Sequence, residues 1–460
     1  MKCWPGNFAG AWAFSMFPVN YSPLMPVQER KKQMKNRSLS KTGLAAALLI
    51  AGLAPVRAAD WPQYRGPDHN GISTEKILGK WPAGGPRQVW KAPTPLGFSS
   101  FAVAEGKACI QVVRSPGGEP REMLVAFDAA TGRQLWATDI GSGRYDKGGD
   151  AGAEDNKGGD GPRSTPVING GKVYAYTQNL VLFCLDGATG KVVWKKDILQ
   201  EYQGRNIQWK SAMSPLVDGN LVFVGGGGPG QSLLAFNKTT GQLAWKAHNE
   251  TITHSTPVAA DILGVRQVIF FLKSGLLAVS PQNGQELWRF PFPFKVSTAI
   301  SPVVCGDIVY CSAGYGVGGG ACKISKAGAG FKATELWKKP GDRPVANHWS
   351  TPVHKDGHLY GMFSFKEYGR GPLKCVAVRT GEVKWSQDGF GPGNVILAGN
   401  QLVALSDAGQ VVLVEATPAG YKESARAKVL DGKCWSTPAL SNGRLYLRST
   451  KEGVCLDIAP

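Results

Sequence analysis

The stretch Asp128-Ala129-Ala130-Thr131-Gly132-Arg133-Gln134-Leu135-Trp136 decides the fold, because its pattern Asp-x-x-Thr-Gly-x-x-x-Trp returns along the chain. A second clean copy runs from Asp186 to Trp194. Less complete copies of the pattern end at Trp245, Trp288, Trp337 and Trp385. Self-similarity with a period of roughly 40–50 residues is the signature of stacked supersecondary units. The chain is therefore expected to be a repeat protein.

Each copy reads as a hairpin that ends in a docking aromatic residue. A short apolar run such as Leu124-Val125-Ala126-Phe127 precedes the pattern and is typical of a buried strand. The Asp side chain can bond the backbone two residues on, and the Gly supplies the positive φ that a tight turn needs. The chain then reverses into an outer strand, whose Trp ring can cover the gap to the neighbouring unit.

A second pattern precedes these hairpins: Ser/Thr-Pro, a few apolar residues, a Gly turn, then Val/Leu-Tyr/Phe. One copy runs from Ser164-Thr165-Pro166 to Tyr174. Pro is tolerated at the first residue of a strand, where its missing N–H costs no ladder bond. Further copies carry Pro215, Pro257, Pro302, Pro352 and Pro438, and degenerate copies start at Phe101 and Val395. Two hairpins per period make a four-stranded antiparallel unit, and the inner strands predict eight such units.

The last unit, which starts at Pro438, lacks an outer strand and a Trp of its own. Gln88-Val89-Trp90, at the other end, precedes the first inner strand and has no unit of its own. A strand at Trp90 that joins the last unit, beside the strand near Leu445, would close the ring and remove an exposed sheet edge. The sequence therefore predicts an all-β, eight-bladed β-propeller over residues 89–460, closed by an N-terminal strand that completes the last blade.

The N-terminal region reads as a targeting segment. Lys35, Arg37 and Lys41 precede an apolar stretch, and Val56-Arg57-Ala58 resembles a small-residue cleavage site. We therefore interpret residues 34–58 as a signal peptide, 1–33 as an extra segment or a misassigned start, and 59–88 as a leader. A periplasmic or secreted monomer without an integral membrane span is expected; a retained anchor is the alternative.

Charge and cysteine usage exclude some functions. The net charge is +18 at pH 7, but Lys and Arg are scattered through turns, so nucleic-acid binding is not expected. The nine cysteines include no adjacent pair and no Cys-x-x-Cys. Cys184, Cys375 and Cys455 share one repeat position and are expected to be small buried residues. A bridge between Cys305 and Cys311 is not expected, because residue 305 should face residue 308.

With both patterns laid out, the chain resembles the pyrroloquinoline-quinone-like (PQQ-like) repeat propellers. That superfamily includes quinoprotein alcohol dehydrogenases and the propeller subunit of the outer-membrane protein assembly machinery. The segment Trp61-Pro62-Gln63-Tyr64-Arg65-Gly66-Pro67 is similar to the leader of secreted propellers named after polyvinyl-alcohol dehydrogenase. The dehydrogenases carry an adjacent Cys pair stacked on the quinone, a Ca²⁺ ion held by Glu and Asn, and an Asp base. This chain lacks the Cys pair, and none of its Glu or Asn residues can be matched to the calcium ligands.

A ligand site is expected on the loops that lead from one outer strand to the next inner strand and ring the channel mouth. These loops carry cations and aromatics that could stack a planar acidic ligand such as a quinone carboxylate. The candidates are Arg163, Gln208, Trp209, Lys210, His254, His348, Trp349 and Trp435. In the alternative interpretation, the two His bond only loop backbone, the last two Trp pack under the loops, and the Arg pairs with the acidic loop before it.

That loop, residues 141–161, is the largest insertion and mixes carboxylates with glycines. A solvated loop, a Ca²⁺ site and a lid over the channel are three interpretations. No EF-hand spacing is present, and no metal site is predicted.

The leading hypothesis is an exported binding or scaffolding propeller with a protein or carbohydrate partner and a polar or acidic ligand site at the channel mouth. The alternative is a PQQ-dependent alcohol or polyvinyl-alcohol dehydrogenase that uses PQQ with Ca²⁺. No catalytic residue can be assigned. A hydrolase is not supported, because G-x-S-x-G and H-E-x-x-H are absent.

Overall fold

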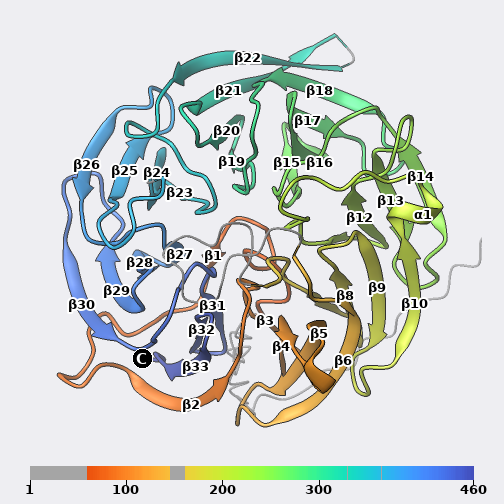
Figure 1. Cartoon of the computed structure of the whole chain (residues 1–460). Helices are drawn as coiled ribbons and strands as arrows, with labels where there is room; N and C mark the ends of the chain where they lie inside the picture. The colour runs from red at the N-terminus through yellow and green to blue at the C-terminus, as the bar shows by residue number, and fades with distance from the viewer. Residues whose placement is uncertain (1–59, 146–160, 329, 364) are drawn as a thin grey trace, which may run out of the picture. The chain divides into compact units, whose positions relative to one another are not determined.

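The computed structural model describes residues 60–145, 161–328, 330–363 and 365–460. All of them belong to the unit Val56–Pro460. They form eight antiparallel blades in a ring, with the outer strands on the perimeter (Figure 1). The eight-bladed all-β prediction is therefore confirmed. No helix among the described residues is long and apolar enough to cross a membrane.

The blades follow one another along the chain, each running from the inner strand to the outer strand. Blades 1 to 4 are β3 (Ala102–Ala104), β4 (Lys107–Arg114), β5 (Arg121–Asp128), β6 (Gln134–Ser142); β7 (Val167–Asn169), β8 (Lys172–Tyr176), β9 (Val181–Asp186), β10 (Val192–Asp197); β11 (Leu216–Asp218), β12 (Leu221–Gly225), β13 (Leu233–Asn237), β14 (Leu243–Ala247); and β15 (Val258–Ile262), β16 (Val265–Leu272), β17 (Gly275–Val279), β18 (Glu286–Pro291). Blades 5 to 7 are β19 (Val303–Cys305), β20 (Ile308–Ala313), β21 (Gly318–Ala327), β22 (Gly330–Lys339); β23 (Val353–Lys355), β24 (His358–Met362), β25 (Leu373–Ala377), β26 (Val383–Gln387); and β27 (Asn394–Ala398), β28 (Gln401–Leu405), β29 (Gln410–Glu415), β30 (Glu423–Lys428). In the described part of the chain, two short helices, η1 (Pro116–Gly118) and α1 (Ile198–Glu201), lie in connections.

Blade 8 consists of β31 (Ala439–Ser441), β32 (Arg444–Arg448), β33 (Glu452–Asp457) and the N-terminal β2 (Arg87–Pro93). The closure prediction is confirmed, with one correction to which strand is the neighbour of β2. The direct neighbour of β2 is β33, where Trp90 faces Cys455, and not the strand near Leu445. The reason is that β33 is the third strand of the blade, so β2 occupies the vacant outer position.

The turn in each repeat has the expected chemistry. The Asp128 carboxylate accepts hydrogen bonds from the backbone N–H of Ala130 (3.0 Å) and Thr131 (2.9 Å) and from the Thr131 hydroxyl (2.9 Å). Gly132 has a φ of 72°. Its missing side chain also makes room for the preceding blade, because a Cβ there would lie 2.6 Å from the Trp90 ring.

The outer-strand Trp residues link adjacent blades. The Trp136 Nε1 donates to the Gly187 carbonyl of blade 2 at 3.0 Å. The same bond to the next blade is formed by Trp90, Trp194, Trp245, Trp337 and Trp385. Trp288 differs, since its Nε1 donates to Gln267 within its own blade.

Burial of these Trp residues is less uniform than the repeats suggest. Trp136, Trp245, Trp288 and Trp337 are buried, but Trp194 and Trp385 are only half-buried. The outer strand is the solvent edge of every blade, so burial of its Trp depends on how much of the ring the neighbouring turn covers.

The Ser/Thr-Pro residues at the start of the inner strands form a hydrogen-bond chain around the axis. The Thr437 N–H of blade 8 donates to the Ser100 hydroxyl of blade 1 at 2.9 Å, and the Ser100 N–H donates to Thr165 of blade 2 at 3.0 Å. The chain continues from Thr165 to Ser214 and from Ser214 to Thr256, and a further link joins Ser301 to Thr351. Sequence reasoning identified the Pro but missed this function of the hydroxyls.

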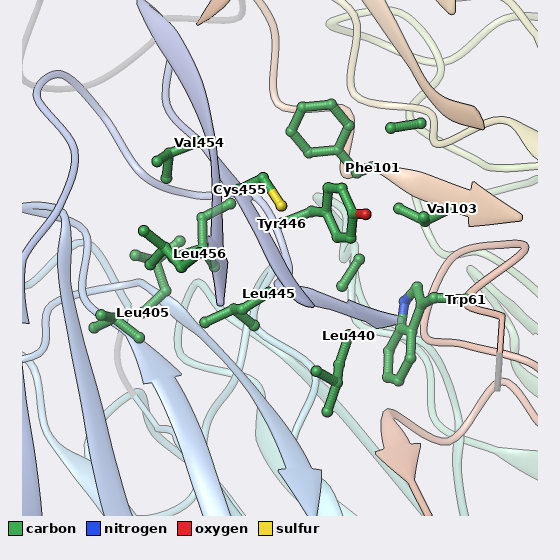
Figure 2. Packing of buried hydrophobic residues seen from close by; sticks show 14 of the residues in the cluster. Trp61, Phe101, Val103, Leu405, Leu440, Leu445, Tyr446, Val454, Cys455 and Leu456 are labelled. Carbon is green, nitrogen blue, oxygen red and sulfur yellow. The ribbon is translucent and has the colours of Figure 1, made fainter. Parts of the chain in front are cut away.

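The leader crosses the centre of the ring, where Figure 1 shows it as the red-orange trace. Trp61 forms a β-bridge with Val103 and packs in the cluster that contains Leu440 and Tyr446 (Figure 2). Further along, β1 (Ile72–Ser73) pairs in parallel with β27, and the Glu75 carboxylate accepts from the backbone of blade 8. The leader therefore contacts three consecutive blades, 7, 8 and 1.

The eight cysteines in the described part of the chain are free and buried. Cys184, Cys375 and Cys455 each face a Tyr of the second strand, as members of the third strand should. Cys305 faces Ile308, so the expected absence of a bridge to Cys311 follows from the register.

Candidate functional site

The loops at one face of the ring enclose a cavity of about 210 Å³ at the mouth of the channel. Its walls come from the connections between blades and from the loops between the second and third strands of blades 5 and 6. Six of the predicted site residues line it: Arg163, Trp209, His254, His348, Trp349 and Trp435. Lys210 and Gln208 do not line the cavity, although their backbones hydrogen-bond the His254 ring.

One side of the cavity combines a cation with an imidazole. The Arg163 Nη1 donates to the Trp209 carbonyl at 2.7 Å, and its guanidinium lies 5.0 Å from the centre of the Tyr145 ring. The His254 Nδ1 pairs with the Ser297 hydroxyl. Burial, with the charge of Arg163 adding to it, lowers the pKa of His254 to about 3. This imidazole is therefore neutral at pH 7.

The other side is aromatic. The Trp435 ring is stacked with Phe98 (4.9 Å between ring centres) and Tyr368 (5.6 Å), and lies 4.9 Å from Trp349. Trp435 is buried, and the Trp349 Nε1 donates to the Pro392 carbonyl. Trp435 therefore packs among aromatic rings and also lines the cavity, and the half-buried Trp349 does the same.

His348 lies among aromatic rings, 5.2 Å from both Tyr315 and Trp349. Its Nδ1 is buried and has no hydrogen-bond partner among the described residues. Burial, with Lys366 nearby, lowers the pKa of this imidazole to about 3. His348 therefore presents a neutral ring with an unused polar atom, which the backbone-bonding alternative does not explain.

The floor of the cavity is rich in hydroxyl groups. Ser100, Ser214 and Thr256 line it, and each hydroxyl oxygen accepts a backbone N–H from the preceding link of the axial chain. A hydroxyl that accepts one bond still has its own proton to donate. Tyr64 of the leader also lines the cavity.

Sequence reasoning missed several lining residues. Tyr315, Lys366 and Tyr368 come from loops inside blades 5 and 6, which the repeat patterns do not cover. Tyr64 comes from the leader, outside the repeats. The repeated Ser/Thr before Pro was the one signal that could have revealed the hydroxyl floor.

Three lining residues hold a left-handed backbone. The φ angles are 65° at Trp209, 60° at Tyr315 and 55° at Lys366. Such angles are uncommon outside Gly and cost of order 1–3 kcal/mol each, and they cluster at functional sites. The strain points to a requirement for the direction of these side chains.

The described lining of the cavity offers few ligands for a calcium ion. Calcium takes roughly 6–8 oxygen ligands, mainly carboxylates and carbonyls. None of the lining side chains in the described ranges is a carboxylate, and no cluster of three His, Cys, Asp or Glu residues suited to a metal ion occurs there. Arg163 and Lys366 in this lining suit an anionic group.

The hypotheses on the acidic loop stay predictions. Residues 146–160, which carry its carboxylates, lie outside the described residues. The proposed pairing of Arg163 with that loop lies outside them too.

Two relatives and one solved structure show what the chain is similar to. It is 24% identical over 311 residues to the outer membrane protein assembly factor BamB of Shewanella oneidensis. This match covers 65% of this chain and 72% of that protein. It is also 30% identical over 139 residues to the quinoprotein alcohol dehydrogenase PedH of Pseudomonas putida. That match covers 28% of this chain and 23% of that protein. The structure of a quinohemoprotein alcohol dehydrogenase from Pseudomonas putida HK5 superposes with a TM-score of 0.59 at 13% identity, over 87% of this chain and 80% of that one.

The similarity to the solved structure concerns the fold alone.

The family model PQQ_2, described as outer membrane protein assembly factor BamB, matches residues 120–387, which is more than half of the chain. The repeats that this model spans run from the third strand of blade 1 to the outer strand of blade 6. The chain therefore belongs to the PQQ_2 family of propellers.

Proposed function

We propose that the chain is an exported scaffold propeller that binds a protein partner by accepting an acidic group of that partner in the mouth cavity. The observation that carries the proposal is the polarity of the cavity. Arg163 and Lys366 line it together with hydroxyl donors, and no carboxylate side chain lines it in the described part of the chain.

An acidic group matches this donor set. A guanidinium offers up to five N–H donors in a planar fork that binds carboxylates well. Because His254 and His348 are neutral at pH 7, the charge at the cavity comes from Arg163 and Lys366. A group with a negative charge would meet two cationic side chains there.

The size and rigidity of the cavity favour a side chain over a large ligand. A volume of about 210 Å³ is below the roughly 300–1,000 Å³ of drug-sized pockets. Trp209 and Tyr315 provide two aromatic walls on a left-handed backbone, with φ of 65° and 60°. Walls that are already in place reduce the ordering cost of binding.

The choice of a protein partner rests on the family. The described relative with the longest match is named an assembly factor for outer membrane proteins. A carbohydrate with a uronic acid would offer the same carboxylate and is one outcome of the test.

The test is a selection from a phage-displayed peptide library against the purified protein. Phage are counter-selected on the Arg163→Ala, His348→Ala double variant. The control is the Arg379→Ala, His358→Ala double variant, which changes the same residue types in blade 6. Arg379 lies in the β25–β26 turn and His358 begins β24, at the end of the blade opposite the β24–β25 loop. We expect enriched peptides to share an Asp or Glu, to bind the control variant, and to lose binding to the cavity variant.

Peptides without an acidic residue, or equal binding to the cavity variant, would contradict the proposal. A glycan array run in parallel would reveal a uronic-acid partner. Spectral titration with PQQ and Ca²⁺, followed by an alcohol-oxidation assay, tests the dehydrogenase alternative that the similarity to PedH favours. Turnover in that assay would replace the scaffold proposal.

A further inference from the structure

The leader is bonded to the propeller on both sides of Tyr64. Before it, the Pro62 carbonyl accepts from the Ile168 N–H of blade 2 at 2.8 Å. After it, the Arg65 guanidinium donates to the carbonyls of Thr351 and Pro352 of blade 6, each at 2.8 Å. Tyr64 therefore lies on a segment that is fixed at two separate points of the channel wall.

Arg65 makes this attachment rigid. It is buried at 2% exposure and also donates to the Asn70 carbonyl of the leader itself at 2.7 Å. Its φ is 65°, and a Cβ on the following Gly66 would lie 3.1 Å from the Trp61 ring. Hydrogen bonds from a charged group to buried carbonyls are among the stronger ones, so this turn of the leader should move little.

Tyr64 itself faces the mouth cavity. It lines the cavity together with Ser100, Thr256 and Thr437 of the axial hydroxyl chain. Its side chain is half-buried, and no other described residue forms a hydrogen bond with its hydroxyl group. A phenol on a rigid segment, beside other hydroxyl donors, is a donor held ready at the floor of the cavity.

We propose that Tyr64 is a ligand-contacting residue that sets specificity, with its hydroxyl donating to the carboxylate that enters the cavity. This inference rests on the proposed function and deepens it, because it makes the leader a part of the binding site. An acidic group then meets Arg163 from the side and Tyr64 from below, while the amide of an otherwise identical side chain loses the charge-assisted part of both bonds.

The experiment compares two probes that differ only in charge, N-acetyl-aspartate N-methylamide and N-acetyl-asparagine N-methylamide. Their binding to the mature protein, leader included, is measured by NMR titration. The variants are Tyr64→Phe, Arg163→Ala and the control Tyr421→Phe, which removes a phenol hydroxyl on the perimeter of blade 7. Thermal unfolding of each variant checks that it is folded.

We expect Tyr64→Phe to weaken binding of the aspartate probe by at least about tenfold, as loss of a hydrogen bond to a charged group should. Binding of the asparagine probe should change by less than about twofold, and Tyr421→Phe should behave as the wild type. As a second readout, the ¹⁹F signal of 3-fluorotyrosine placed at position 64 should shift with the aspartate probe and not with the asparagine probe.

The possible failures are distinguishable. If Arg163→Ala abolishes aspartate binding while Tyr64→Phe binds as the wild type and the ¹⁹F signal does not move, the inference about Tyr64 is wrong and the proposed function stands. If the wild type does not prefer the aspartate probe, or Arg163→Ala has no effect, the proposed function fails and the inference fails with it.

Discussion

The indole ring of Trp136 lies so close to Gly190 of the next blade that a Cβ at position 190 would come within 2.7 Å of it. The same Trp donates its Nε1–H to the Gly187 carbonyl of that turn at 3.0 Å. The Gly and the Trp of the repeat therefore serve one interface from opposite sides, with the Gly of one blade receiving the Trp of the blade before it. This pairing couples the local turn to the closure of the ring.

The first prediction concerns this contact. Gly190→Ala should lower the free energy of unfolding by about 2–5 kcal/mol, because left-handed strain of about 1–2 kcal/mol adds to overpacking of about 1–3 kcal/mol. The control is Gly106→Ala, where φ is 75° but a Cβ would meet no atom within 4 Å. That variant should lose only the strain contribution. Urea unfolding of both measures the difference, and equal losses would show that the Trp contact contributes nothing.

A second prediction concerns the Trp residues themselves. Trp245→Ala, at a buried position, should cost about 3–5 kcal/mol through the cavity it leaves. Trp194→Ala should cost less, because this ring is half-buried and water can replace part of its contacts. The denaturant midpoints of the two variants measure these losses of stability. A larger loss for Trp194→Ala than for Trp245→Ala would contradict the prediction.

A third prediction concerns Glu122, which is fully buried in blade 1. Burial raises the pKa of its carboxyl group to about 8 from the ordinary 4.5, against the opposing effect of hydrogen bonds from Gln111 and Gln178. The folded state thus binds a proton that the unfolded state releases, so this contribution to stability is complete below about pH 4.5 and is lost as the pH rises through about 8.

Glu122→Gln should therefore flatten the fall in melting temperature between about pH 4.5 and pH 8. Glu119→Gln, at an exposed ion pair with Arg144, should leave the slope as in the wild type. Parallel pH profiles for wild type and Glu122→Gln would refute the role of this carboxyl group.

A fourth prediction concerns the pH dependence of binding. Burial lowers the pKa of both His254 and His348 to about 3, below the ordinary 6.5, so neither ring gains a proton between pH 8 and pH 5 in the folded protein. Affinity for the aspartate probe should accordingly stay constant over this range. An increase of about tenfold on acidification, roughly 1.4 kcal/mol, would mean that a charged imidazole binds the ligand.

The same two rings should destabilise the fold in acid. Their folded-state pKa values are lowered, so the stability present above about pH 6.5 is lost as the pH falls toward 3, where only the unfolded chain takes up the protons. His348→Phe should reduce this loss in a thermal unfolding series, whereas an unchanged acid slope would contradict it.

A fifth prediction concerns export. Expressed in a bacterium with a periplasm, the protein should be recovered from that compartment with its N-terminus near Ala59, because a charged, then apolar, then small-residue segment precedes this position. Mass spectrometry of the purified protein measures the terminus. Full-length protein in the cytosol or inner membrane would instead favour a retained anchor.

The candidate site could be predicted in part. Arg163, His254 and His348 were recognised because each precedes an inner strand, and the ring brings all such loops to one mouth. Lys210 was placed there by the same logic but does not line the cavity, since position along a loop does not decide where a side chain points. Tyr64 had no signal at all, because nothing in a leader outside the repeats indicates that it enters the channel.

The amino-acid sequence by itself determined the number of blades, their strand order and the closure by β2, because turn chemistry and apolar periodicity act over a few residues and repeat along the chain. Only the tertiary structure decided which side chains meet on the axis. There, Ser100, Tyr64 and His348 line one cavity, although Tyr64 and His348 are 284 residues apart in the sequence. Their proximity depends on ring closure and on the path of the leader through the channel, which are properties of packing between units and leave no local pattern in the sequence.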